Sequence, residues 1–160
     1  MADRIELINF IKLSSEEKKM ILLWRNDDNI RIWMHNNSYI ELRDHLSFIE
    51  SLKKSSNTLY FLVKKGNSYL GVIDFTNINS NSAEFGLYSN PKLKAIGKVL
   101  LKIICNYAFN ELNIKTLHAE VFYDNVKAIK LYKKFDFLEM KKKVINNREV
   151  TYMELKNENR

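Results

Sequence analysis

The segment 90–109 has the residue types and spacing that most suggest binding of a ligand, because a loop of small and basic residues leads directly into a helix. The first turn of a helix has unpaired backbone N–H groups and carries about half a positive charge. Small residues let a ligand approach that backbone, and lysines add positive charge. This pattern predicts a phosphate site, most naturally for a pyrophosphate, although an ordinary surface loop before a core helix is the alternative. The residues concerned are Lys92, Lys94, Ala95, Gly97 and Lys98.

Periodicity predicts the elements that must position this loop. Apolar residues at helical spacing follow it, in the i, i+3, i+4, i+7 pattern of an amphipathic helix. We predict one α/β domain over residues 1–160, with a mixed sheet and flanking helices. The expected strands are 5–11, 59–64, 69–75, 83–88, 116–122, 137–144 and 149–155, and the expected helices begin near 14, 29, 41, 96 and 126.

Composition limits the classes of protein to consider. The net charge of +7 and pI of about 9.4 favour an anionic partner, such as the phosphates of a cofactor, a nucleotide or nucleic acid. The single cysteine, Cys105, is expected to be buried and inert, which suits a cytoplasmic protein. Three scattered histidines and one cysteine predict no metal site. No run is long and apolar enough for a membrane span, and no concentrated basic-aromatic stripe predicts RNA binding.

The segment VFYDNVKAIKLYKKFDF (residues 121–137) resembles the V-x3-N-x2-A-x2-LY-x4-F signature of the GCN5-related N-acetyltransferases, the GNAT superfamily. The loop KLKAIG (residues 92–97), followed by KVLL, resembles the acetyl-CoA pyrophosphate loop of that family. It departs from the family pattern in having Lys92 for Gln or Arg and Ala95 for the first glycine. We expect Ala95 to allow close approach if its φ is negative. Two motifs in the right order, with a strand between them, confirm each other.

This resemblance implies a fold and a donor. The fold would be a central, mostly antiparallel sheet of about seven strands, splayed between the fourth and fifth, and we expect a bulge near Gly86 to open it. The donor would be acetyl-CoA. Cofactor contacts would come from the loop before the helix, from the fourth strand and from the signature segment: Leu87, Tyr88, Lys92, Lys94, Ala95, Ile96, Gly97, Lys98, Val99, Asn125, Ala128 and Tyr132.

The same resemblance suggests two catalytic residues. Tyr132 lies two helical turns after Asn125 on one face, and its phenol could protonate the departing thiolate; a core tyrosine is the alternative. Asn125 is expected to cap its helix and to bind the arm of the cofactor. Glu84 could act as a general base or anchor a water, against the alternative of a structural carboxylate. A water relay alone could also suffice.

The N-terminal half carries LWRN (residues 23–26), Ile30, Trp33-Met34, Ile40, His45 and Phe48, and residues 69–91 contain GVIDFTNIN and EFGLYSNP. These segments resemble the acetyltransferases of pseudaminic acid synthesis, which act in flagellin glycosylation. This implies a UDP-linked 4-amino-4,6-dideoxy sugar, acetylated on its 4-amine in a ternary complex. Arginines would hold the phosphates, aromatic residues would stack on uracil or sugar, and His45 could contact a phosphate or hydroxyl, unless it is simply structural. The implied acceptor contacts are Arg25, Arg31, Trp33, Met34, His45, Phe48 and Tyr88.

Two other functions stay open at this point. A ribosomal-protein or other peptide N-terminal acetyltransferase would share the fold, but a cationic peptide amine favours an acidic cleft, and this chain is basic. A non-catalytic CoA-binding module belongs to another class, and Tyr132 beside a matching cofactor loop argues against it. The sequence leaves a homodimer open.

Overall fold

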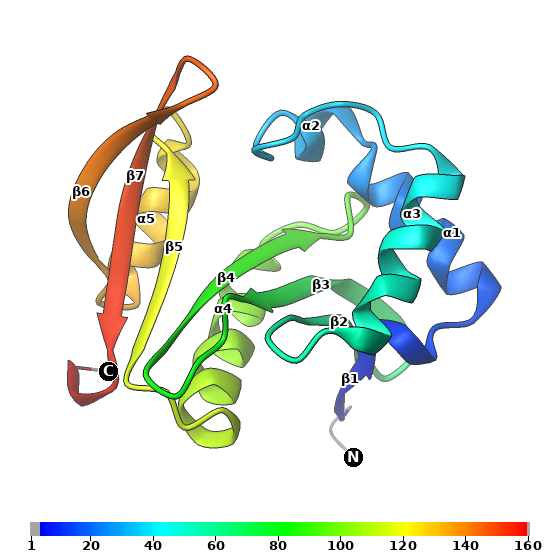
Figure 1. Cartoon of the computed structure of the whole chain (residues 1–160), viewed down its shortest axis with the longest axis horizontal. Coiled ribbons are helices and arrows are strands. Elements are labelled where there is room, and N and C mark those ends of the chain that lie inside the picture. Colours follow the sequence, from blue (N-terminus) through cyan, green and yellow to red (C-terminus); the bar gives the residue numbers. More distant parts are fainter. Residues whose placement is uncertain (1–3, 160) are drawn as a thin grey trace.

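The computed structural model describes residues 4–159, which form a seven-stranded sheet in the order β1-β2-β3-β4-β5-β7-β6. All neighbouring strands are antiparallel except β4 and β5, which run parallel. Along the chain, three helices follow β1, the strands β2, β3 and β4 come in succession before α4, and α5 separates β5 from the β6–β7 hairpin (Figure 1). Their bounds are β1 Ile5–Asn9, β2 Leu59–Lys65, β3 Ser68–Thr76, β4 Ser82–Ser89, β5 Thr116–Phe122, β6 Leu138–Ile145 and β7 Arg148–Lys156.

Helices cover the two faces of the sheet and form a separate core on each. On one face, α4 and α5 pack against residues such as Phe75, Phe85 and Leu117. On the other face, α1 and α3 pack against Leu62 and Val72. The helices are α1 Ser15–Arg25, α2 Asp28–Arg31, α3 Leu42–Ser51, α4 Gly97–Asn106 and α5 Val126–Lys134, with a π turn at Tyr107–Glu111 after α4.

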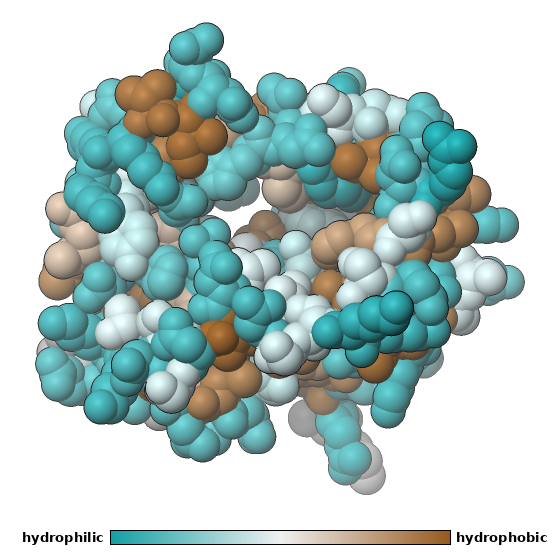
Figure 2. All heavy atoms as spheres, in the orientation of Figure 1, coloured by the Kyte–Doolittle hydropathy of each residue, from teal (hydrophilic) through white to brown (hydrophobic). Residues whose placement is uncertain are grey.

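The sheet is splayed between β4 and β5. These strands pair only from Ser82 to Glu84, opposite residues 116–118, although both continue well beyond that point. Beyond Glu84 the two halves of the sheet diverge, as Figure 1 shows. The space-filling view is hollowed between them (Figure 2). The β3–β4 ladder runs through Gly86 without a register shift, so the bulge expected there is absent. The short β4–β5 pairing alone produces the opening.

A loop closes the splayed side of the molecule. Residues 32–38, which we call the arch, follow α2 and reach the β6–β7 hairpin (Figure 1). The Asn146 side chain donates to the His35 carbonyl (3.3 Å), and Arg148 donates to the Ile32 carbonyl (2.8 Å). The two halves of the sheet are therefore joined at both ends of the opening.

Most expected elements form within two residues of their predicted bounds, and β5 and α5 match them. The first strand is shorter than expected. Asn9 caps a 3-10 turn over Phe10–Lys12 through a hydrogen bond from the Ile11 N–H, which ends the strand at Asn9. Cys105 is buried and forms no disulfide, as expected. Within residues 4–159, no helix combines the length and apolar character that crossing a membrane requires.

Candidate active site

The loop before α4 presents backbone N–H groups without a side-chain cap. Ile96 occupies the N-cap position of this ten-residue helix, and no side chain accepts a hydrogen bond from the first turn. Ala95, just before it, has a φ of 59°, so the negative φ on which its close approach to a ligand was made conditional is not adopted. The backbone thus keeps the left-handed conformation that glycine would adopt there at no cost, and the alanine side chain bears the strain.

The next glycine of the loop serves packing. A Cβ built on Gly97 would lie 3.2 Å from Leu131 Cδ2 of α5, closer than ordinary van der Waals contact. Gly97 therefore lets the start of α4 approach α5. Lys92, Lys94 and Lys98 are exposed around this loop and supply mobile positive charge. The uncapped N–H groups and these lysines fit a phosphate group.

Tyr132 and Asn125 sit on α5 as expected. The Asn125 side chain accepts a hydrogen bond from the Ala128 N–H (3.3 Å) and caps the helix, which confirms its capping role. The Tyr132 ring is buried between Phe85 and Phe137. Burial, and then the charge of Asp74, raise the pKa of the Tyr132 phenol above its ordinary value. Tyr132 is therefore a neutral phenol near neutral pH, which can donate a proton.

Asp74 is the functional candidate that sequence reasoning missed. It lies on β3, in register with Tyr60 on β2 and with Gly86 on β4, so the three form a row across the sheet. A Cβ at Gly86 would lie 2.7 Å from Asp74 Oδ2, so the missing side chain makes room for this carboxylate. Burial, and then the nearby Glu84, raise the pKa of Asp74 to about 7.

Glu84 marks the point where the sheet divides. It forms the last β4–β5 pair, opposite His118, whose Nε2 lies 3.7 Å from Glu84 Oε1. Burial, and then the charge of Glu120, raise the pKa of Glu84, while Lys143 lowers it. Glu120 itself is ion-paired with Lys143. Three carboxylates, those of Asp74, Glu84 and Glu120, thus lie around the start of the opening.

Two of the predicted acceptor residues hold the arch. Arg25 Nη2 donates to the Asn36 carbonyl (2.6 Å), and Arg31 Nη1 donates to the Asn37 carbonyl (3.5 Å). Each guanidinium also keeps a buried donor without a partner, namely Nη1 of Arg25 and Nε of Arg31. A buried N–H without a partner is costly, so both atoms are available to an anionic ligand.

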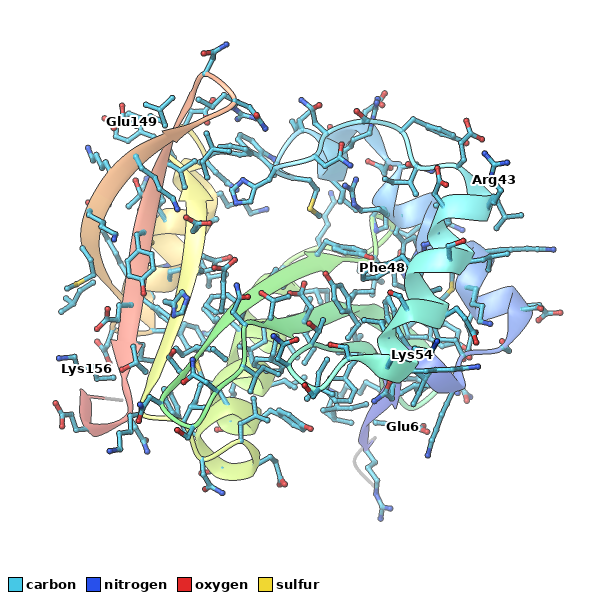
Figure 3. All side chains as sticks on the ribbon, viewed as in Figure 1. Glu6, Arg43, Phe48, Lys54, Glu149 and Lys156 are labelled. Atoms are coloured by element: carbon cyan, nitrogen blue, oxygen red, sulfur yellow. The ribbon has the colours of Figure 1, made fainter. Side chains whose placement is uncertain are left out.

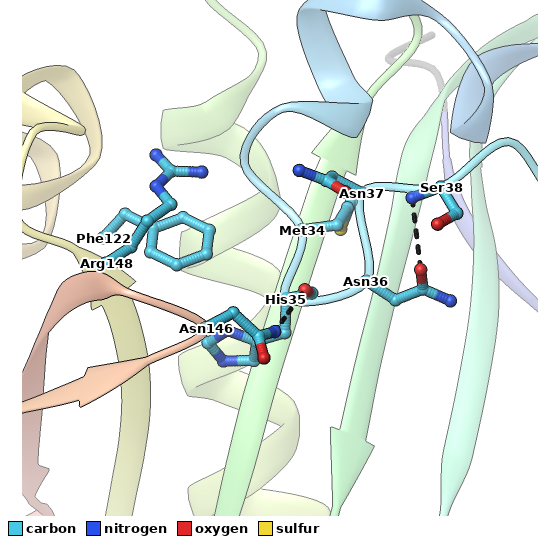
Figure 4. A pocket seen from close by; sticks show the side chains of 8 residues that line it. All are labelled: Met34, His35, Asn36, Asn37, Ser38, Phe122, Asn146 and Arg148. Atoms are coloured by element: carbon cyan, nitrogen blue, oxygen red, sulfur yellow. Dashed lines mark hydrogen bonds between the residues drawn. The ribbon is translucent and has the colours of Figure 1, made fainter.

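A pocket of about 520 Å³ lies between the arch and the β6–β7 hairpin. In Figure 4 the Arg148 guanidinium lies over the Phe122 ring, 3.6 Å from its centre, and Met34 faces the pocket. Trp33 is also near Arg148, whose Cζ lies 5.7 Å from the ring. The lining residues are Met34, His35, Asn36, Asn37, Ser38, Phe122, Asn146 and Arg148.

The remaining predicted acceptor residues separate into two groups. Phe48 lies on the side of α3 that faces the sheet (Figure 3) and packs edge-on against Tyr60, with ring centres 4.9 Å apart. Tyr88 lies on β4 and packs against the same core. His45, in contrast, is 5% exposed, and its Nε2 lies 2.9 Å from the Lys18 carbonyl. This position favours the structural alternative for His45 over a contact with substrate, because the ring joins α3 to α1.

Within residues 4–159, no group of three or more His, Cys, Asp or Glu side chains could hold a metal ion. The site is a split sheet with uncapped backbone N–H groups and lysines on one side, a neutral phenol beside the split, and carboxylates and arginines on the other side. These features suit the transfer of an acyl group from a phosphorylated carrier to an acceptor.

Comparison with known proteins defines the class. A model of the acetyltransferase (GNAT) family matches residues 19–137, and the chain belongs to this family. Acetyltransferase PseH of Campylobacter jejuni strain NCTC 11168 is 47% identical over 133 residues, which cover 83% of this chain and 84% of that protein. PseH of strain 81-176 is 45% identical over the same shares.

Solved structures agree with this assignment. The crystal structure of C. jejuni N-acetyltransferase PseH in complex with acetyl coenzyme A has a TM-score of 0.83 and 38% identity, covering 96% of this chain and 99% of that one. Spermidine N-acetyltransferase of Vibrio cholerae, in complex with CoA and spermine, has a TM-score of 0.86 at 21% identity, over 97% and 96% of the two chains. The latter likeness concerns the fold alone. The predicted fold, including the splay between the fourth and fifth strands, is confirmed.

Proposed function

We propose that the protein is an N-acetyltransferase that moves acetyl from acetyl-CoA to the 4-amino group of a UDP-linked 4-amino-4,6-dideoxy sugar in the pseudaminic acid pathway. The identity of 45–47% to PseH over 83% of the chain carries this proposal. Acetyl-CoA supplies the acyl group as an activated thioester. Residues of the loop before α4 and the start of α5 would hold it, with its pyrophosphate at the uncapped N–H groups of α4.

The charges on the acceptor side suit a substrate that is anionic at one end and carries an amine at the other. Arg25 and Arg31 keep unpartnered guanidinium donors for phosphate oxygens. Asp74 and Glu84 place carboxylates near the splay for the amine. Trp33 and Phe48 are 37% and 39% exposed, and they offer aromatic surface to a base or sugar. A polyamine acceptor would have no use for the two arginines.

Different residues would have different roles in acetyl transfer. The split between β4 and β5 would hold the thioester in line with the amine. Tyr132, held neutral by burial, would protonate the sulfur that leaves. Tyr88 and Phe48 would exclude water from the acceptor side. The chain would act in the cytoplasm, as a monomer or a homodimer.

Turnover tests the acceptor directly. Thiol release from acetyl-CoA is followed with UDP-4-amino-4,6-dideoxy-N-acetyl-β-L-altrosamine, with spermidine, and with a peptide bearing a free N-terminus. We expect turnover with the nucleotide sugar only. Isothermal titration of UDP-N-acetylhexosamine into the CoA-saturated protein should show uridine-dependent binding. Turnover with spermidine or the peptide, and none with the sugar, would keep the acetyltransferase and overturn the acceptor.

A further inference from the structure

Resting on the N-acetyl transfer proposed above, we infer that Asp74 is the catalytic residue that takes the proton from the acceptor amine. This residue lies two positions after Val72 on β3, and residues two apart in a strand share a face. Val72 belongs to the core under α1 and α3, so Asp74 lies on the sheet face that these helices cover. The acceptor would bind on this face, where Arg25 and Phe48 also lie. Asp74 is therefore on the acceptor side of the sheet.

The row of side chains across the sheet directs the carboxylate toward the opening. Tyr60, Asp74 and Gly86 are in register on β2, β3 and β4. Tyr60 occupies the β2 side of Asp74, and on the β4 side Gly86 has no side chain, so the carboxylate lies over its Cα. The next strand position beyond Gly86 is vacant, because β5 leaves β4 after Glu84. Asp74 thus borders the split in which the thioester would lie.

The titratable groups that interact with Asp74 are Tyr60 on β2, Glu84 and Tyr88 on β4, and Tyr132 on α5. Arg25 on α1 interacts in turn with Tyr60 and Tyr88. The charge of Asp74 raises the pKa of Tyr60, Tyr88 and Tyr132, in each case after burial. Three phenols held neutral leave Asp74 and Glu84 as the groups of this set that can accept a proton near neutral pH.

The step then balances. The amine nitrogen forms a bond to the carbonyl carbon of the thioester, and the bond from that carbon to sulfur breaks. The nitrogen loses one proton, which Asp74 takes, and the sulfur gains one, which Tyr132 gives. Protonation of Asp74 removes the negative charge that holds the proton on Tyr132, so the first transfer favours the second. Return of the proton from Asp74 to Tyr132 restores both groups.

Glu84 is the competing base, and its surroundings favour a structural role. It forms the last rung of the β4–β5 ladder, and His118 Nε2 lies 3.7 Å from its carboxylate. Its carboxylate is thereby directed along the sheet toward β5. Asp74 has no ion-pair partner among the described residues, and burial raises its pKa to about 7, the range that suits a general base.

Three amide variants test this assignment: Asp74→Asn, Glu84→Gln and the exposed control Asp136→Asn. We measure kcat and kcat/KM for acetyl-CoA and UDP-4-amino-4,6-dideoxy-N-acetyl-β-L-altrosamine from pH 5.5 to 9. Asp74→Asn should lower kcat at least 100-fold at pH 8 and leave the Kd of acetyl-CoA unchanged. In the wild-type protein, kcat/KM should rise as the pH passes about 7. This rising limb of the pH profile should be absent in Asp74→Asn. Asp136→Asn should behave as wild type.

Gly86→Ala provides a second test that keeps the carboxylate. The added Cβ would force Asp74 to move, since it would lie 2.7 Å from Oδ2. We expect at least a tenfold loss of kcat in the wild-type background and no further loss in Asp74→Asn, which is the signature of two residues acting together. Infrared difference spectra, wild type minus Asp74→Asn, should show a carboxyl band that disappears as the pH rises through about 7.

Several results would overturn the assignment. One is that Asp74→Asn keeps kcat within threefold and retains the limb, and another is that Glu84→Gln removes the limb instead. A third is the absence of a carboxyl group titrating near pH 7 in the infrared spectra, a readout that needs no acceptor. If the wild-type protein does not acetylate the nucleotide sugar, the proposed acceptor is wrong. The variants are then compared on the amine that it does acetylate, while the infrared result stands unchanged.

Discussion

The Tyr132 ring meets the Phe85 ring edge-on, with centres 5.3 Å apart and planes at 67°. Phe85 belongs to β4, which borders the split on the side of β1–β3, while Tyr132 belongs to α5, which follows β5 on the other side. This contact joins the two halves of the molecule beside the opening. It fixes the position of the phenol by packing, so removal of the hydroxyl alone should leave the ring in place.

Tyr132→Phe should therefore lower the catalytic rate while the fold stays unchanged. General acids contribute about 10²–10⁴-fold, and we expect kcat to fall by at least about 100-fold. The Kd of acetyl-CoA should change less than threefold, because the ring packing is kept. Stopped-flow turnover and calorimetry check both values. An unchanged kcat would exclude Tyr132 as the acid.

Asp74→Asn should stabilise the protein at neutral pH. Folding raises the pKa of this carboxyl from 3.8 to about 7, so the folded state binds the proton more tightly than the unfolded state. The free energy of unfolding therefore falls as the pH rises from about 4 to 7, and the loss is complete above 7. We expect the variant to gain on the order of 2 kcal/mol at pH 8, since one pKa unit corresponds to about 1.4 kcal/mol and the group keeps some solvent contact.

Urea denaturation at several pH values measures this difference. The gap between Asp74→Asn and wild type should be near zero at pH 4 and widen up to pH 7. Asp136→Asn, at an exposed position, serves as the control for the change of an aspartate to an asparagine. A constant gap at all pH values would mean that packing, and not the charge, causes the effect.

Ala95→Gly should also stabilise the fold. An L-residue in the left-handed region costs about 1–2 kcal/mol, and glycine avoids this cost but loses more chain entropy, about 0.5–1 kcal/mol. The expected net gain is roughly 0.5 kcal/mol. The matched control Ala108→Gly, buried in the π turn after α4, should destabilise. Equal losses in both variants would contradict the strain assigned to Ala95.

Gly97→Val tests the loop as the binding site of the donor. The β-branched side chain would press on Leu131 Cδ2, the flexible end of a side chain on α5, and it would narrow the approach to the first turn of α4. We expect acetyl-CoA binding to fall below detection by calorimetry, while circular dichroism stays native. Wild-type affinity in this variant would place the pyrophosphate elsewhere.

Arg148→Ala should loosen the arch. The guanidinium donates to Ile32 and to Asp124 and stacks on Phe122, so its removal breaks all three contacts. We expect the KM of the acceptor to rise at least tenfold, with less than a twofold change for acetyl-CoA. Arg148→Lys should not restore the acceptor KM, because an ammonium group lacks the planar fork. Recovery by lysine would show that charge alone matters.

Much of the fold could be predicted because periodicity is a local property of the chain. The α5 helix, capped by Asn125, and the alternating β5 strand show clear patterns and match their expected bounds. The site was only partly predictable. Asp74 stands in an ordinary strand sequence, and its role depends on register with Gly86, twelve positions later. No local sequence pattern predicts that Asp74 pairs with Gly86.

Two other outcomes depend on tertiary packing in the same way. His45 has helical spacing that fits either a ligand or a core residue, and only the packing of α3 on α1 brings its ring to the Lys18 carbonyl. The positive φ of Ala95 follows from the path that joins β4 to α4. The signal that could have revealed Asp74 is a lone acidic residue within an otherwise apolar strand, beside a partner strand that carries glycine.

The opening between β4 and β5 is bounded by the short strand pairing at one end and by the arch at the other. The sheet separates its two faces, which communicate through the opening between β4 and β5. The loop before α4 lies on one face of the sheet and Asp74 lies on the other, so each proposed substrate would exchange with bulk water on its own side. Neither product would block the exit of the other. Product inhibition by CoA should then compete with acetyl-CoA alone, and the order in which the two substrates arrive should not affect the rate.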